Sequence, residues 1–238
     1  MSRASDSAGA CPESAGPAPA GGARPWYALK DPFPAWSHWA GAALSVVALV
    51  VLLDAAAGRP VHVAAFTVYG ASMVLLYLAS ALAHSVRCGE HAARQLDRFD
   101  YTAIFLLIAG TYTPFCLITL RGAVGWTLLA AVWLVAAAGI AGLYLGSGSR
   151  HWPRVLTYVL MGWLSLFAAE GLIRALPRSG ILWMIAGGVV YTAGALVYAT
   201  RRPRLWPGRF DYHDLWHCMV LAGSACHFIV VLRYVAPG

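Results

Sequence analysis

Charged side chains are scarce in this sequence, and their scarcity excludes an ordinary soluble domain. Asp, Glu, Lys and Arg make up 11% of the 238 residues, whereas 60% of the residues are hydrophobic. A soluble domain carries roughly 25% charged residues. The apolar residues also gather in long blocks, which is the pattern of membrane spans. The formal net charge of +7 therefore indicates basic loops between spans and no nucleic-acid partner.

The sequence also lacks a CxxC pair and an apolar leader. Its five cysteines are too scattered for a disulfide framework and are expected to be free thiols. Residues 1–30 contain no apolar run of the kind that a cleavable signal peptide needs. They are rich in Ala, Gly, Pro and Ser, which predicts a disordered cytoplasmic tail. Residues 31–238 are predicted to form one membrane domain.

Seven apolar segments follow the tail, each near the roughly 20 residues that a helix needs to cross about 30 Å of hydrocarbon. Turn residues and charges separate them, as in Gly58-Arg59-Pro60. We therefore predict an all-α integral membrane protein, a seven-helix bundle in the inner or plasma membrane that contacts membrane lipids. The oligomeric state does not follow from the sequence. The predicted helices run over about 36–53, 61–83, 100–120, 124–145, 152–173, 181–200 and 211–235.

Lysine and arginine are distributed unevenly between the two ends of these segments. Alternate connections place 12 of the 17 basic residues at one end and 5 at the other. Positive residues stay on the cytoplasmic side of a membrane. The N-terminus is therefore predicted to be cytoplasmic and the C-terminus outside, which is the parity that seven spans require.

Five polar residues are predicted to share one layer near the cytoplasmic end. His84 ends the second segment with Ser80 one turn away on the same face, and Asp100 begins the third segment. His213 and His217 begin the seventh segment, and their spacing places both imidazoles on one helix face. Polar groups at membrane depth are costly and indicate a functional site.

This layer is predicted to hold a zinc ion through His84, His213 and His217. Three imidazoles and a water form catalytic zinc sites, in which the metal lowers the pKa of the water towards about 7. Asp100 is then expected to orient that water and take its proton. Ser80 is expected to support the site or to polarise a substrate carbonyl. Taken singly, Asp100 has the alternative role of a helix cap, and Ser80 that of a small packing residue.

Two further histidines lie on the first and seventh segments. His38, at the inner end of the first segment, is a candidate for an additional ligand or for an outer partner of a ligand. His227 lies ten residues beyond His217, about 15 Å further along the helix. That distance is too great for His227 to share the metal.

Three groups of motif residues occur in order along the chain. They are Ser80-Ala-Leu-Ala-His84, then Phe99-Asp100-Tyr-Thr-Ala-Ile-Phe-Leu-Leu-Ile-Ala-Gly-Thr-Tyr-Thr-Pro114, then His213-Asp-Leu-Trp-His217 with Gly223-Ser-Ala-Cys-His227-Phe228. From about residue 31 to its end, the chain resembles the hemolysin III family, the bacterial branch of the progestin and adipoQ receptor (PAQR) superfamily. The resemblance implies seven helices with the N-terminus inside. It also implies zinc on His84, His213 and His217, with Asp100 on the zinc-bound water and Ser80 beside it.

The sequence departs from the family in its first motif. The family often has an acidic residue seven positions before the first-segment histidine, with an Asn between them. Asp31 and Pro34 hold those places here. The acidic residue is retained with the shorter side chain of aspartate, and the Asn side chain is lost because proline stands there. The role of this motif therefore stays open.

Three functions are compatible with these residues. The first, favoured by the ceramidase-like chemistry of eukaryotic relatives, is a zinc-dependent hydrolase of a lipid amide or ester. The second is a cytolytic or receptor-type membrane protein whose zinc is structural. The third and least favoured is an intramembrane metalloprotease that uses His213-Asp-Leu-Trp-His217 as a variant of HExxH, with Asp214 as the base.

Overall fold

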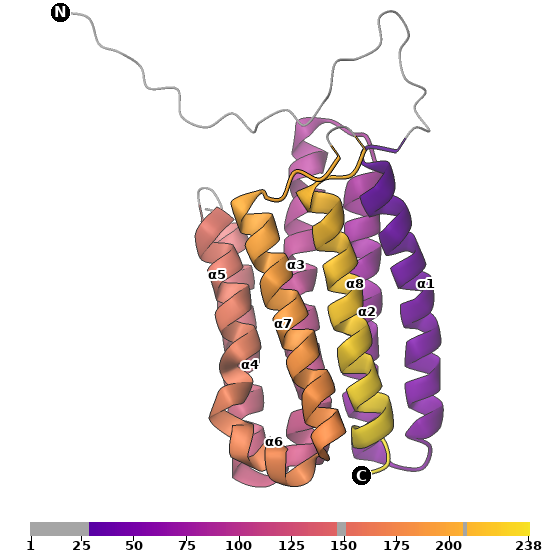
Figure 1. Cartoon of the computed structure of the whole chain (residues 1–238), viewed down its shortest axis with the longest axis vertical. Coiled ribbons are helices and arrows are strands. Elements are labelled where there is room, and N and C mark those ends of the chain that lie inside the picture. Colours follow the sequence, from indigo (N-terminus) through magenta and orange to yellow (C-terminus); the bar gives the residue numbers. More distant parts are fainter. Residues whose placement is uncertain (1–28, 147–150, 207–208) are drawn as a thin grey trace, which may run out of the picture.

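The computed structural model describes residues 29–146, 151–206 and 209–238, so the predicted tail lies outside the described residues except for its last two positions. Within the described ranges, seven helical segments are long and apolar enough to cross a membrane, which confirms the predicted all-α bundle (Figure 1). The helices are α1 (Pro32–Ala55), α2 (Pro60–Ser85), α3 (Glu90–Pro114), α4 (Gly122–Leu145), α5 (His151–Gly162), α6 (Ala169–Ala175), α7 (Arg178–Thr200) and α8 (Tyr212–Val230).

Local sequence signals explain where several helices begin and end. Pro32 and Pro60 stand at the first positions of α1 and α2, where the missing N–H of proline costs nothing and its fixed φ suits a helix. Between these helices Gly58 turns the chain at a φ of +75°, a conformation that residues with a Cβ rarely adopt. α3 and α8 continue as π-helical turns over Phe115–Leu120 and Val231–Val235.

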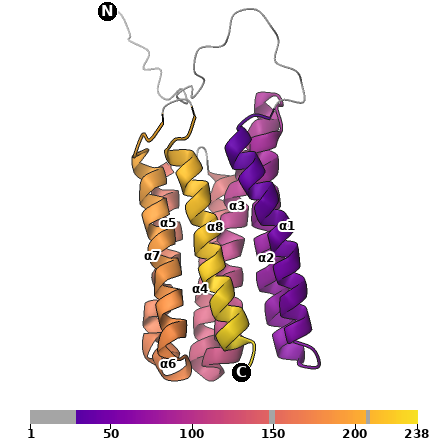
Figure 2. The same ribbon diagram turned by 45° about the vertical axis from the view of Figure 1, so that its right-hand side comes forward.

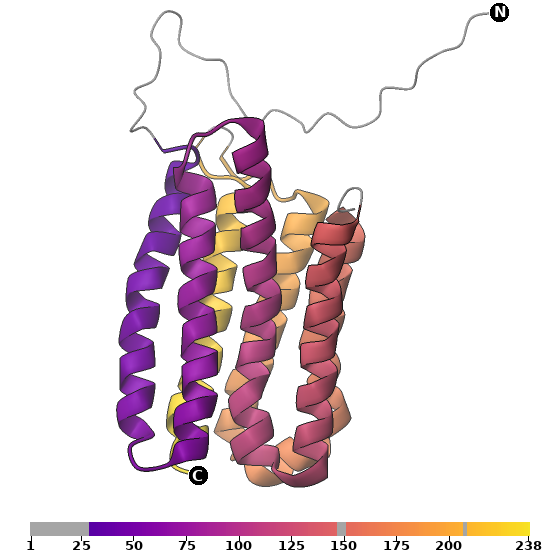
Figure 3. The same ribbon diagram turned by 180° about the vertical axis from the view of Figure 1, so that it is seen from behind.

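The helices form two rows. α1, α2, α3 and α4 stand side by side in chain order (Figure 3), and consecutive members of this row contact each other. α8 packs against α7 on the other side of the bundle and also contacts α1, as the rotated view shows (Figure 2). Large apolar side chains such as Leu134 and Phe167 point outward, where a membrane supplies lipid.

α1, α3, α5 and α8 begin at the same end of the bundle, at which α2 also ends. We call this the histidine end, because it contains His84, His213 and His217. The sequence predicts that this end is cytoplasmic. The chain ends at the opposite end, beside the turn between α1 and α2 (Figure 1).

Two helices differ from the predicted spans. α3 begins at Glu90, ten residues before the expected start, and it extends beyond its neighbours at the histidine end (Figure 3). The expected boundary reflects where hydrophobicity begins, whereas the helix itself also includes the amphipathic turns before that point. The fifth span is interrupted, since a 3-10 segment over Trp163–Ala168 separates α5 from α6.

Candidate metal site

Three histidines converge at the histidine end of the bundle. Ring nitrogens of His84, on α2, and of His213 and His217, on α8, all lie within 4.8 Å of one another. The Nε2 atoms of His213 and His217 face each other at 3.2 Å. The structure therefore brings together the three residues that the sequence predicts as metal ligands, from helices far apart in the chain.

A capping box at the start of α8 fixes the two histidines of that helix. The Asp211 side chain accepts hydrogen bonds from the backbone N–H groups of His213 and Asp214, and Asp214 Oδ2 in turn accepts from Asp211 N at 2.8 Å. His213 is thereby held in the first turn, with His217 one turn further along. Asp214 Oδ2 thus has a structural role in this cap, whereas the metalloprotease hypothesis assigns Asp214 the role of a base.

Two of the three histidines have a partner for their second ring nitrogen. His84 Nδ1 lies 2.9 Å from Asp31 Oδ2, and His217 Nδ1 lies 2.9 Å from His38 Nε2. His38 is fully enclosed, with 2% of its surface exposed. In metal sites, a ligating imidazole usually donates its other N–H to a carboxylate or a similar acceptor. Both contacts fit that arrangement.

The Asp31 carboxylate is charged at neutral pH. Its partial burial opposes ionisation, but the hydrogen bond with His84 and the positive charge of Lys30 outweigh this effect, so the pKa of Asp31 lies below its ordinary value. An ionised carboxylate can only accept hydrogen bonds. The proton in the contact with His84 is therefore on Nδ1, so in the neutral ring Nε2 is the nitrogen that carries the lone pair.

The donor set fits a transition-metal ion. Imidazole nitrogen is a suitable ligand for zinc, copper, iron and nickel. Two neutral imidazoles whose Nε2 atoms face each other at 3.2 Å need either a proton or a cation between them. The three histidines can therefore hold a metal ion.

A small polar cavity of about 40 Å³ lies beside the three histidines. His213 and His217 line it together with Ser80 and Asp100, which lie close enough to interact with each other. A water molecule needs at least about 10–15 Å³, so the cavity has room for a few waters or one small polar group. The structure thus places both predicted catalytic residues next to the candidate ligands.

Asp100 does not have the capping role that its sequence position also allowed. It lies ten residues after Glu90, the first residue of α3, so it stands inside the helix. An N-terminal cap precedes the first turn. A carboxylate inside a helix and beside three histidines requires a different explanation, and the adjoining polar cavity supplies one.

Arg154 is a residue of this site that the sequence analysis counted only among the 12 basic residues of the predicted cytoplasmic end. It stands in the first turn of α5, is 9% exposed and lines the small cavity. Its guanidinium lies 3.6 Å from the ring centroid of Tyr101. Its Nη1 atom is buried and has no hydrogen-bond partner in the described part of the chain. A buried charged donor of this kind favours an anionic or carbonyl oxygen in the cavity.

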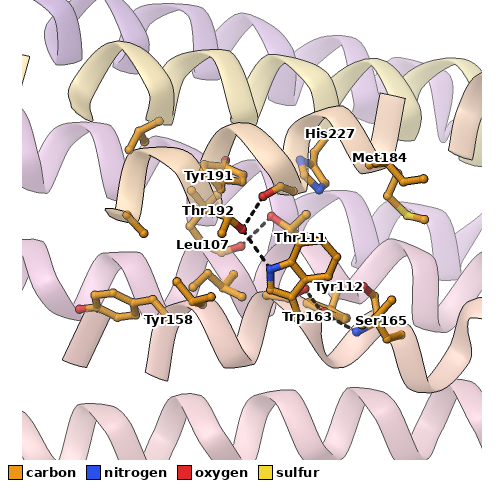
Figure 4. Close-up of a pocket in the computed structure, with 18 of the residues that line it drawn as sticks. Leu107, Thr111, Tyr112, Tyr158, Trp163, Ser165, Met184, Tyr191, Thr192 and His227 are labelled. Atoms are coloured by element: carbon orange, nitrogen blue, oxygen red, sulfur yellow. Dashed lines mark hydrogen bonds between the residues drawn. The ribbon is translucent and has the colours of Figure 1, made fainter. Parts of the chain in front are cut away.

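A second, apolar cavity of about 300 Å³ adjoins the small one. It lies between α3, the fifth span, α7 and α8, and Figure 4 shows part of its lining. The two cavities share Ile104, Tyr158, Ala195 and Trp216 in their walls. The apolar cavity therefore lies directly beside the polar cavity at the histidine end.

The interruption of the fifth span forms one wall of the apolar cavity. Tyr112, from the Thr-Tyr-Thr-Pro motif, donates to the Gly162 carbonyl at 2.6 Å and accepts from Ser165 N at 2.9 Å (Figure 4). Trp163 Nε1 donates to Thr192 Oγ1 of α7 at 3.0 Å. Backbone groups freed by a break at membrane depth need such partners. The motif tyrosine thus stabilises the irregular segment.

His227 lies on the wall of the apolar cavity, away from the three histidines. Figure 4 shows its ring among the residues that line this cavity. Its Nδ1 atom forms a hydrogen bond with the Gly223 carbonyl one turn earlier, at 2.9 Å. It is absent from the metal-binding group, as its spacing along α8 predicts.

Fold and site together define a multi-pass membrane protein, a seven-helix bundle with a possible metal site of three histidines at one end. The model of the family described as "Haemolysin-III related" matches residues 26–228. The chain belongs to this family. In bacteria, a multi-pass protein of this kind resides in the plasma membrane.

Individual relatives agree with this assignment. The chain is 43% identical over 203 residues to Hemolysin-3 of Bacillus cereus, which covers 84% of this chain and 90% of that protein. It is 38% identical over 200 residues to the Hemolysin-3 homolog of Bacillus subtilis strain 168, covering 83% and 91% respectively. A heptahelical transmembrane protein of rice named ADIPOR1 is 28% identical over 189 residues, covering 71% of this chain and 50% of that protein. This more distant similarity supports the wider PAQR superfamily.

Proposed function

We propose that this protein is a zinc-dependent hydrolase that cleaves an amide or ester bond of a membrane lipid. One observation carries the proposal: a small polar cavity beside three histidines shares a wall with a larger apolar cavity inside a membrane bundle. A lipid has the same two parts, a polar linkage and an apolar chain. The pairing of the cavities therefore matches the chemistry of the proposed substrate.

His84, His213 and His217 are the residues that would hold the zinc ion, His84 through Nε2. When bound, zinc supplies Lewis acidity and makes a water acidic enough to act as a nucleophile near neutral pH. Asp31 and His38 contact the second ring nitrogens of His84 and His217.

Asp100 is the proposed general base and acid. Its carboxylate accepts a proton from the attacking water and later returns it to the leaving amine or alkoxide, so that one water is consumed and a carboxylic acid is released. Ser80, beside Asp100 in the same cavity, is proposed to orient this carboxylate or to donate a hydrogen bond to the carbonyl.

Arg154 is the proposed electrophilic partner of the substrate carbonyl. Its buried Nη1 has no acceptor within the described residues, and it lines the cavity in which the scissile bond would lie. A donor that is held in place before the reaction stabilises the charge that develops on the carbonyl oxygen. The ring of Tyr101 supports the guanidinium from one face.

The apolar cavity is proposed to hold the acyl chain. Its volume of about 300 Å³ falls at the lower limit of typical ligand pockets, and most of its lining is hydrophobic. Because it lies next to the polar cavity, a chain within it places its carbonyl carbon near Asp100 and Arg154.

The test compares wild type with Asp100→Asn, reconstituted in lipid vesicles with a labelled ceramide-like lipid. We expect about one zinc per chain in both proteins by elemental mass spectrometry, and about a 10²- to 10⁴-fold loss of hydrolysis in the variant. Asp54→Asn changes an exposed carboxylate at the far end of α1 and serves as the matched control. Wild-type protein without zinc, or Asp100→Asn with full activity, would contradict the proposal.

A structural metal is a second candidate function. The three histidines come from α2 and α8, so a bound metal would link these helices. The relatives named hemolysin make cytolysis the activity to assay in that case. Purified protein that loses stability with a chelator, lyses red cells and hydrolyses no lipid would favour this function over hydrolysis.

A further inference from the structure

The segment that precedes α1 runs along the end of α2. Asp31 N donates to the His84 carbonyl at 2.9 Å, and Arg87 Nη2 donates to the Leu29 carbonyl at 2.8 Å. These bonds hold the Asp31 side chain beside the His84 ring. The short side chain of Asp31 therefore reaches His84, because the backbone of Asp31 is hydrogen-bonded to the end of α2.

The hydrogen bonds of the histidines determine which nitrogen of each ring is free. Asp31 accepts from Nδ1 of His84, so Nε2 is the free atom of that ring. His217 Nε2 faces His213, so its Nδ1 is the atom that reaches His38. If His217 binds a metal through Nε2, its Nδ1 carries the proton and His38 Nε2 accepts it.

His38 is placed to act as an acceptor and not as a further ligand. Its Nε2 atom is occupied by the bond to His217, and it is absent from the group of ring nitrogens that can hold a metal among the described residues. With Nε2 as the acceptor, its proton must lie on Nδ1, which is buried without a hydrogen-bond partner in the described structure. The ring packs edge-on against Tyr77, with centroids 5.0 Å apart. A buried N–H without an acceptor costs free energy. The contact of His38 Nε2 with His217 is the interaction that can offset this cost.

We infer that Asp31 and His38 are positioning residues that set the tautomer and ring orientation of His84 and His217 for metal binding. The inference rests on the proposed metal site and adds a role for the motif whose function the sequence left open. Asp31 supplies a charged acceptor and His38 a neutral one. Outer partners of this kind raise the affinity of a site without touching the metal.

The experiment measures zinc affinity of the full-length protein by competition with a chelator of known affinity. We expect Asp31→Ala and His38→Ala each to weaken zinc binding by about 10- to 100-fold. Asp31→Asn keeps an acceptor for His84 Nδ1 without the charge and should recover part of the loss. The matched controls are Asp54→Asn, an exposed acid at the other end of α1, and His62→Gln, a buried histidine at the other end of α2.

Cobalt substitution provides a second readout that a purely structural role would not change. The visible absorption of bound cobalt should shift in the Asp31 and His38 variants and stay unchanged in both controls. If His38→Ala fails to insert, His38→Gln and the Asp31 variants carry the test.

The outcomes separate this inference from the proposed function. If His84→Ala retains zinc at wild-type affinity, the metal site itself is wrong. If His84→Ala loses zinc while the Asp31 and His38 variants bind it as tightly as wild type, only the positioning roles are wrong.

Discussion

α2 has a buried histidine near each end, and the two are held in different ways. His62 and His84 are 7% and 8% exposed, so burial does not distinguish them. His62 Nε2 contacts the Gly238 carbonyl at 3.0 Å and Arg59 Nη1 at 3.2 Å. His84 faces two other imidazoles and an acid. The partners of a buried imidazole, and not its burial, indicate what it can bind.

Charge strengthens this contrast between the two ends. Arg59 donates hydrogen bonds to the backbone carbonyls of Ala55, Ala236 and Gly238, so it links the end of α1 to the residues that follow the last helical turn. Its positive charge beside His62 disfavours a cation there. Asp31 places a negative charge beside His84, which favours a cation. One end of α2 is therefore suited to hold helix ends together, and the other to hold a metal.

The largest expected difference between the two ends is in metal content. His84→Ala removes one of the three candidate ligands and is expected to abolish stoichiometric metal binding, whereas His62→Ala should retain it. Elemental mass spectrometry of the purified proteins measures both. Equal metal content in the two variants would show that His84 and His62 do not differ in metal binding.

Arg154 at the histidine end and Arg59 at the other end should differ next in their effect on turnover. Arg154→Met removes the free donor of the small cavity and is expected to lower lipid hydrolysis by about 10²- to 10³-fold with metal content unchanged. Arg59→Met should leave turnover per folded molecule unaltered. Steady-state assays on reconstituted protein measure this, and an equal loss in both variants would show that Arg154 acts only through stability.

Metal removal should destabilise wild type more than a variant that cannot bind metal. A ligand present at about 100 times its Kd stabilises the folded state by about 2.7 kcal/mol. Chelator should therefore lower the Tm of wild type and leave that of His84→Ala unchanged. Thermal unfolding in detergent, with and without chelator, tests this expectation. A chelator effect that persists in His84→Ala would point to a different metal site.

The smallest expected effect belongs to His62. His62→Ala leaves the Gly238 carbonyl with Arg59 as its remaining partner, and we expect a loss of about 1–3 kcal/mol in the free energy of unfolding. This loss should be the same with and without chelator. A chelator-dependent change would mean that the two ends of α2 are coupled.

The sequence predicted the seven spans and the family because both depend on residue order alone. It also predicted the layer with His84, His213 and His217, because alternating spans bring the end of the second and the start of the seventh to one side, and helix periodicity puts His213 and His217 on one face. It placed the start of α3 ten residues late, since hydrophobicity marks the entry into the membrane and not the first helical turn. The capping role it allowed for Asp100 was wrong for the same reason.

The break in the fifth span was not predicted because residues 163–168 are apolar except for Ser165 and contain neither proline nor glycine. Residues 163–168 leave the α-helical path where Tyr112 and Thr192, from α3 and α7, contact them. Hydrophobicity averaged along the sequence contains no information about contacts with other helices. The cavity that depends on this break was therefore also beyond prediction.

What the sequence by itself determined is the set of segments and the depth of the polar residues, since both follow from hydrophobicity and helix rise along one chain. Tertiary structure decided the rest of the site. It placed Arg154, which the sequence showed only as a basic residue near one end of a span, in the wall of the small cavity. It also brought Asp31 to His84 and His38 to His217. These contacts depend on how each helix is rotated about its axis and on which neighbour it meets, and residue order specifies neither without packing.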